Sequence, residues 1–134
     1  MPRTRIDQTD GLTVAEVTHT QFSALPATAT VADVRDWFAA STSRRLAFLA
    51  DDGRYAGSLM PSDIGAAVEG GRRAVDVAQQ GPTVSPAASA ATGRDLALLT
   101  EARRVPVVDG EGRLLGVVAV TGDLQSFCGT GTDG

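Results

Sequence analysis

The chain contains two copies of one sequence pattern. Residues 27–57 and 86–116 align without a gap at a constant offset of 59 residues. Each copy runs from a helical segment through a pair of arginines into two apolar segments separated by an acidic, glycine-containing turn. The identical aligned positions are Ala29/Ala88, Ala32/Ala91, Arg35/Arg94, Asp36/Asp95, Arg44/Arg103, Arg45/Arg104, Gly53/Gly112, Arg54/Arg113 and Gly57/Gly116. Because one such unit cannot bury its apolar face alone, we expect two similar halves that pack on each other.

The bulk composition is that of a soluble globular protein. A chain of 134 residues with 43% hydrophobic and 21% charged residues is long enough to bury a sizeable core in one compact domain. Only 4% of the residues are aromatic, so the core has to be built from Ala, Val and Leu.

Charge and hydropathy exclude several classes of protein. A net charge of −4 argues against nucleic-acid binding through a basic surface. The apolar run 114–120 is far too short to span a bilayer. No apolar segment follows the first arginines as a secretory signal would require, and the single cysteine, Cys128, cannot form an intramolecular disulfide. We therefore expect a cytoplasmic protein without membrane insertion.

The first copy predicts a short helix, a strand, a longer helix, a hairpin and a closing helix. Thr13 and Glu16 have the spacing of a capping box, Asp and Gly at 51–54 suit a hairpin turn, and Pro61 suits a helix start. The predicted elements are helices at 13–17, from residue 30 through 38 and at 61–68, and strands at 24–25, 46–49 and 55–60.

The second copy predicts the same order. Its expected helices are 73–78, 89–102 and 121–127, and its expected strands are 83–84, 105–108 and 114–120. The fold class is therefore α+β, with two pseudo-symmetric β-α-β-β-α repeats packed sheet to sheet. The predicted organisation is a flexible leader at 1–11, repeat 1 at 12–69, repeat 2 at 72–127 and a flexible tail at 128–134.

These segments resemble a tandem pair of CBS (cystathionine β-synthase) domains, also called a Bateman module. The strongest similarity is in the second copy, where Arg-Arg-Val-Pro-Val-Val-Asp at 103–109 and Gly-Arg-Leu-Leu-Gly-Val-Val at 112–118 match the central signature of the family. The first copy carries a degraded form at 43–49 and 53–59, and the resemblance covers about residues 12–126.

The resemblance implies a regulatory module and not an enzyme. The family commonly binds adenosine-containing ligands (AMP, ADP, ATP or S-adenosylmethionine) in clefts between the two repeats and often forms homodimers. It therefore implies a stand-alone sensor that signals to an unknown downstream protein. A second hypothesis is a structural or partner-docking dimer module whose nucleotide sites are vestigial.

The family's ligand signature points to the end of each copy. In the first copy Asp63 falls in register as a ligand of the ribose hydroxyls, Met60 replaces the usual hydroxyl residue, and Ser62 lies nearby. The alternative role of Asp63 is to cap the first turn of its helix. In the second copy Asp123 stands one residue late and Ala119 replaces the hydroxyl residue, with Thr121 nearby. Thr121 and Asp123 are also ordinary residues of a turn into a helix.

The arginine pairs are the other candidate ligand residues. In the family the positions ahead of the central strand often point at the ligand phosphates, which match the forked donors of a guanidinium group. These candidates are Arg44, Arg45, Arg103 and Arg104; the alternative is one exposed and one ion-paired arginine per copy. Val84 and the strand that contains Pro106 and Val107 would form an adenine slot, although such residues are more often core.

The remaining polar and glycine-containing patterns predict no metal site and no catalytic site. His19 has no Cys or acidic cluster at ligand spacing, so no metal site is expected. Cys128 has no neighbouring His, and the Gly-Thr-Gly pattern of the tail is followed by no helix. Since no base–nucleophile pair is present, the sequence predicts no catalysis.

Overall fold

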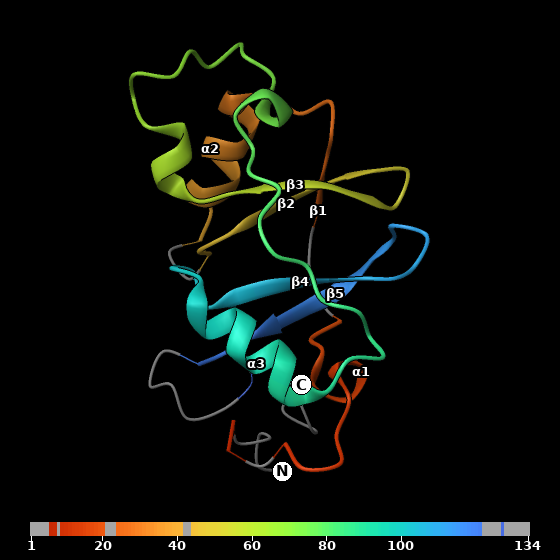
Figure 1. Cartoon of the computed structure of the whole chain (residues 1–134). Coiled ribbons are helices and arrows are strands. Elements are labelled where there is room, and N and C mark those ends of the chain that lie inside the picture. Colours follow the sequence, from red (N-terminus) through yellow and green to blue (C-terminus); the bar gives the residue numbers. More distant parts are fainter. Residues whose placement is uncertain (1–5, 8, 21–23, 42–43, 122–126, 128–134) are drawn as a thin grey trace. The chain divides into compact units, whose positions relative to one another are not determined.

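The chain folds into two compact units. The structure, a computed structural model, describes residues 6–7, 9–20, 24–41, 44–121 and 127. Unit 1 comprises Met1–Phe22 and Pro82–Gly134, and unit 2 comprises Ser23–Gly81. The elements, labelled in Figure 1, are α1 (Val14–Val17), β1 (Ala24–Pro26), α2 (Val31–Ala39), β2 (Ala47–Asp51), β3 (Arg54–Leu59), the 3-10 turns η1 (Pro61–Ile64) and η2 (Ala74–Asp76), α3 (Ala90–Leu99), β4 (Arg104–Val108) and β5 (Leu114–Ala119).

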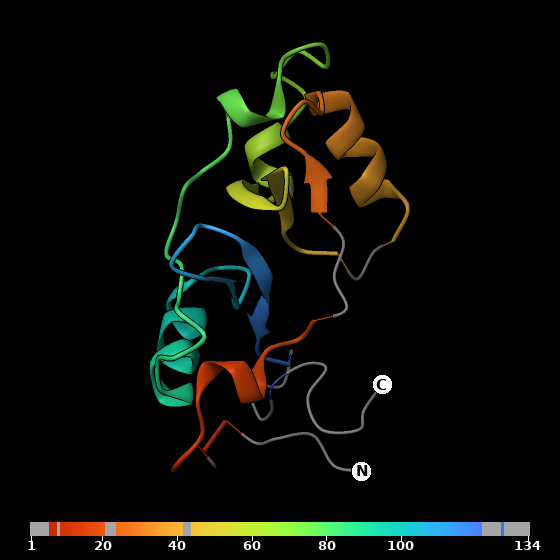
Figure 2. The ribbon, with the colours of Figure 1, turned by 90° about the vertical axis from the view of Figure 1, so that its right-hand side faces the viewer.

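Unit 2 is a three-stranded sheet with helices on one side. Strand β1 runs parallel to β2, which pairs antiparallel with β3. Helix α2 begins where Thr30 and Asp33 exchange hydrogen bonds between side chain and backbone, with donor–acceptor distances of 3.0 and 3.2 Å. Helix α2 contacts η1, and in Figure 1 α2 lies above this sheet; Figure 2 shows the same unit turned by 90°. The apolar faces of α2 and η1 close the core around Val31, Val34, Ala47, Leu49, Leu59, Ile64 and Ala74.

Unit 1 repeats this plan with a shorter sheet. Strands β4 and β5 pair antiparallel, and Val84 adds a single parallel bridge to Val107 in place of a first strand. The core packs α1 and α3 against this ribbon and is made of Val14, Val17, Val84, Ala90, Ala97, Val105, Val107, Val118, Val120 and Phe127. Valine and alanine dominate it, as the low aromatic content requires.

The compact units are offset from the sequence copies. Helix α1, from the start of the first copy, belongs to unit 1, where Thr13 forms a bridge with Ser89. The corresponding segment of the second copy belongs to unit 2, where Arg73 forms a bridge with Thr30. Each unit is thus completed by the segment that precedes the other copy in the sequence. The repeat bounds of 12–69 and 72–127 remain a prediction about the sequence copies.

An identical arginine in each unit holds the chain that precedes the incoming segment, which is residues 13–19 in unit 1 and 73–79 in unit 2. Arg94 of α3 donates to the carbonyl of Ile6 at 2.9 Å, and Arg35 of α2 donates to the carbonyl of Gly65 at 2.7 Å. Ile6 and Leu12 also pack against the core of unit 1, and Thr9 is buried. Of the leader predicted at 1–11, Ile6 thus contacts the core of unit 1 and Thr9 is buried, while the flexibility of the leader as a whole stays a prediction.

Two glycines at identical positions let the incoming segment lie on the last strand of each sheet. Ser58 of β3 forms a bridge with Gln79, and Val117 of β5 forms the equivalent bridge with His19. A Cβ atom on Gly57 would lie 2.9 Å from Ala78 Cβ, and one on Gly116 would lie 2.7 Å from the His19 carbonyl oxygen. Gly57 also has a φ of +139°, which disfavours other residues.

The α+β class, the strand order and the capping box at Thr13 are confirmed. The helix predicted at 61–68 was wrong in length, because the 3-10 turn η1 ends before Gly65, whose φ and ψ are −59° and 170°. The helix predicted at 73–78 is the three-residue turn η2.

In the predicted helix 121–127, residues 122–126 lie outside the described residues, and Phe127 forms a bridge with Val120. The tail 128–134 also lies outside them. Sheet-to-sheet packing of the repeats stays a prediction.

The close approach at Gly116 predicts a large effect of one methyl group. Gly116→Ala should destabilise the protein by about 2 kcal/mol, because the His19 backbone has to move away from β5. Urea unfolding measures the change. Gly110→Ala is the matched control, since nothing lies within 4 Å of a Cβ built there. Equal stability of the two variants would contradict the close approach.

Candidate functional site

The first arginine of each pair caps the preceding helix. Arg44 Nη1 donates to the carbonyl of Trp37 at 2.5 Å, and its guanidinium carbon lies 4.4 Å from the centre of the indole ring. Arg103 Nη1 donates to the carbonyls of Leu98 and Thr100 at 2.6 and 3.0 Å. Carbonyls at a helix C-terminus lack backbone donors and favour a cation. Arg44 and Arg103 therefore stabilise the ends of α2 and α3.

The second arginines differ from the first and from each other. Arg45 is exposed, and within the described ranges no hydrogen bond or ion pair of its side chain is found. Arg104 is half-buried, donates from Nη1 to the Ala102 carbonyl at 2.9 Å, and has a further polar partner. Arg45 is thus the member of the four best placed to meet an anion from solution.

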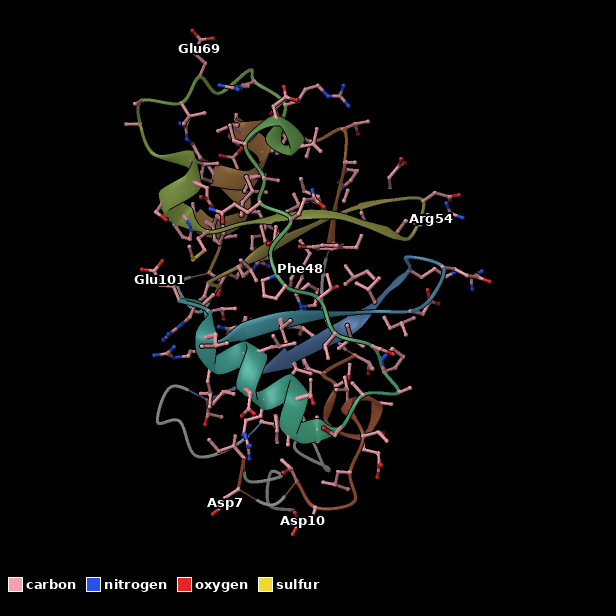
Figure 3. All side chains as sticks on the ribbon, in the orientation of Figure 1. Asp7, Asp10, Phe48, Arg54, Glu69 and Glu101 are labelled. Carbon is pink, nitrogen blue, oxygen red and sulfur yellow. The ribbon has the colours of Figure 1, made fainter. Side chains whose placement is uncertain are left out.

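Arg54 is identical in both copies but belongs to a hairpin tip. Figure 3 shows its side chain at the end of the β2–β3 hairpin, where it is exposed. Its counterpart Arg113 forms an ion pair with Glu111. The identity of this position between the copies reflects the turn and identifies no site.

Asp63 is the centre of a small polar cluster in unit 2. Its Oδ2 accepts a hydrogen bond from the Met60 backbone N–H at 2.7 Å, so the predicted capping role is confirmed. Its Oδ1 accepts from the side-chain amide of Gln79 at 2.8 Å. Asp63 is half-buried and Gln79 is exposed. The ribose-binding role of Asp63 stays a prediction.

The segment that carries Gln79 is held along β3 by further contacts. The Tyr55 hydroxyl donates to the Gln80 carbonyl at 3.2 Å, and the Gln80 side-chain amide donates to the Ala56 carbonyl at 3.2 Å. Burial raises the pKa of the Tyr55 hydroxyl, and a hydrogen bond with Ser58 opposes this rise. Gln79 and Gln80 were not predicted from the sequence as site residues, because two glutamines before Gly81 form no periodic pattern or motif that indicates a site.

The corresponding place in unit 1 carries different groups. His19 takes the position of Gln79, since both pair with equivalent residues of the last strand. Thr121 is buried and has a polar partner, while Asp123 lies outside the described residues. Val84 belongs to the core, as its alternative role predicted, and Pro106 lies on the face of β4 opposite to Val105 and Val107.

The cluster in unit 2 is suited to hydroxyl donors more than to phosphate. Pro61 has no N–H, and the Asp63 N–H donates to the Met60 carbonyl at 2.9 Å, so the start of η1 offers few free amides. Ser62 is exposed beside Asp63. A carboxylate with an outward face accepts hydrogen bonds from neighbouring hydroxyl groups, such as a vicinal diol.

The described residues contain no group of metal ligands and no membrane-spanning helix. Within them, no three His, Cys, Asp or Glu side chains gather as metal ligands would. In the same part of the chain no helix has the length and hydropathy needed to cross a bilayer.

One family model matches part of the sequence. Residues 75–121 match the model of the CBS domain. None of the curated proteins compared with the sequence matches it.

Solved structures share the fold over most of the chain. The CBS-pair protein CBSX2 from Arabidopsis thaliana is 20% identical with a TM-score of 0.70, covering 81% of this chain and 89% of that chain. The CBS domains of a transcriptional regulator from Streptococcus pneumoniae are 22% identical with a TM-score of 0.70, covering 82% and 94%. CBSX2 has also been solved in complex with AMP, with 20% identity, a TM-score of 0.69 and coverage of 81% and 90%.

The capping role of Arg103 predicts a loss of stability without the side chain. Arg103→Ala removes two hydrogen bonds to helix carbonyls and should destabilise the protein by about 1 kcal/mol. Urea unfolding measures this. Arg113→Ala, which removes only an exposed ion pair, should cost less than about 0.5 kcal/mol. Similar losses in the two variants would argue against the cap.

The raised pKa of Tyr55 predicts an alkaline loss of stability. The folded protein holds the phenolic proton more tightly than the unfolded chain, whose tyrosine ionises near pH 10. Stability from this group is therefore complete below about pH 10 and is lost as pH rises through the folded pKa. Tyr55 is the only tyrosine in the chain, so its absorbance at alkaline pH reports it alone. Tyr55→Phe should reduce the alkaline loss; an unchanged profile would contradict the shift.

Proposed function

We propose that this chain, which has the fold of a tandem CBS pair, is a regulatory protein that binds an adenosine-containing nucleotide. The observation that carries the proposal is the half-buried Asp63 carboxylate, which stands where the family resemblance expects the ribose ligand. The AMP complex of the similar plant protein supports adenine nucleotides as the ligand class.

The chemistry of unit 2 assigns a role to each group. The Asp63 carboxylate would accept hydrogen bonds from the ribose hydroxyls, as carboxylates do from vicinal diols. Arg45 would neutralise the phosphate. It precedes β2 and, because Ala47 pairs with Leu59, the antiparallel register puts Arg45 and Asp63 at the same end of the sheet. S-adenosylmethionine has no phosphate and would not use Arg45, which makes AMP, ADP or ATP the favoured ligands.

Regulation would follow from the difference in affinity between two conformations. A ligand shifts such an equilibrium only by as much as it binds one state more tightly than the other. We propose that nucleotide occupancy is passed in this way to a downstream protein, that the chain acts as a homodimer in the cytoplasm, and that it is not an enzyme.

A second candidate function is a docking module with vestigial sites. One observation favours it: both oxygens of Asp63 already accept hydrogen bonds from the protein, from Met60 and from Gln79. The replacement of the signature hydroxyl residues by Met60 and Ala119 points the same way. Such a module would not respond to any adenine nucleotide.

Calorimetric titration with AMP separates the two functions. Asp63→Ala should weaken AMP binding about tenfold or more, because hydrogen bonds to a charged acceptor contribute about 1.5–3 kcal/mol. Asp36→Ala, which removes an exposed carboxylate from α2 of the same unit, should leave the affinity unchanged.

A second titration tests whether Asp63 binds the ribose hydroxyls. AMP lacking the 2′-hydroxyl should bind the wild-type protein more weakly, and this difference should vanish in Asp63→Ala. No heat of binding and no thermal stabilisation with millimolar AMP, ADP, ATP or S-adenosylmethionine would favour the docking module.

A further inference from the structure

The side chain of Gln79 joins the candidate ligand site to a chain segment that leaves unit 2. Its amide donates to Asp63 Oδ1, while its backbone N–H and carbonyl pair with those of Ser58 at 2.8 and 2.9 Å. Two residues later the chain passes from unit 2 to unit 1 at Gly81 and Pro82. Asp63 therefore contacts the beginning of the inter-unit connection through one exposed side chain.

The exposed position of Gln79 makes its contact with Asp63 easy to break. An exposed glutamine loses rotamer freedom when it holds one geometry, so such a contact gives little net stability. The other contacts of the segment, from Tyr55 and to Ala56, involve Gln80 and do not touch Asp63. The contact of Gln79 alone can thus respond to what happens at the carboxylate.

We infer that Gln79 is a latch: its amide competes with a bound ligand for Asp63, and its release loosens the start of the inter-unit connection. Within the proposed function, on which the competition rests, a ribose diol needs the outward faces of both carboxylate oxygens. Met60 donates to Oδ2 from a half-buried backbone position, whereas the Gln79 amide donates to Oδ1 from the exposed side, so a diol that reaches Oδ1 from solvent has to displace the Gln79 amide.

The latch lowers the affinity of the site for its ligand, and it couples ligand binding to a change in the chain at residues 79–81. The ligand displaces an internal donor, so part of its interaction energy replaces a bond that the protein already made. When the ligand is bound, the backbone amides of residues 79–81 are no longer restrained by the hydrogen bond between Gln79 and Asp63. In unit 1 the equivalent position is occupied by His19, so the two units do not share this glutamine amide.

A ligand-free double-mutant cycle tests the restraint. Hydrogen exchange of the Gln79 and Ser58 amides is measured in the wild type, Gln79→Ala, Asp63→Ala and the double variant. Gln79→Ala should raise these rates roughly threefold to tenfold, and the double variant should exchange no faster than Asp63→Ala. Asp36→Ala, which removes an exposed carboxylate of α2 in the same unit, is the control and should exchange as the wild type does. Unchanged rates in Gln79→Ala, or additive effects, overturn the latch.

Titration with AMP tests the competition. Gln79→Ala should bind AMP roughly threefold to tenfold more tightly than the wild type, because the ligand no longer displaces an internal donor. Weaker binding by Gln79→Ala would make Gln79 a ligand contact and overturn the inference. Absence of AMP binding by both proteins would overturn the competition together with the proposed function. The exchange cycle would then still decide whether Gln79 restrains the connection.

Discussion

The structure depends on two close backbone approaches, at Gly57 and Gly116. At each glycine the incoming segment lies on the last strand of a sheet, so near that a Cβ atom would fall 2.9 Å from Ala78 Cβ or 2.7 Å from the His19 carbonyl oxygen. These contacts complete both units, because they place a segment from outside the sheet where its backbone pairs with Ser58 or Val117. The same approach brings Gln79 to Asp63.

Residues that are identical between the copies serve the fold first. Arg35 and Arg94 hold the chain ahead of the incoming segments, and Arg44 and Arg103 hold the ends of α2 and α3. A guanidinium group suits this role, because it offers several donors to backbone carbonyls that still have acceptor capacity. The groups left for a ligand are Arg45, whose surroundings differ from those of its counterpart Arg104, and the cluster around Asp63. An internal repeat thus marks the shared architecture more reliably than it marks a site.

Much of the fold could be predicted from the residues. The capping residue Thr13, the Asp-Gly turn after β2 and the apolar strands each act through local backbone preferences, and the structure has them close to the predicted positions. The helix expected after Pro61 is only a short 3-10 turn, because a start signal does not show where Gly65 will end it. Of the candidate site, Asp63 was found through its register, whereas Gln79 was missed because it follows no pattern.

The sequence by itself determined the duplicated α+β architecture, since periodicity, capping and turn residues act over a few neighbouring positions. Only the tertiary structure decided which segment completes which unit, because Thr13 pairs with Ser89, and Arg73 with Thr30, across long stretches of chain. It also decided that Arg44 and Arg103 act on helix ends and that the Asp63 carboxylate has an internal donor. Such pairings depend on which atoms lie close together in the folded chain, and the spacing of residues along the sequence does not show this.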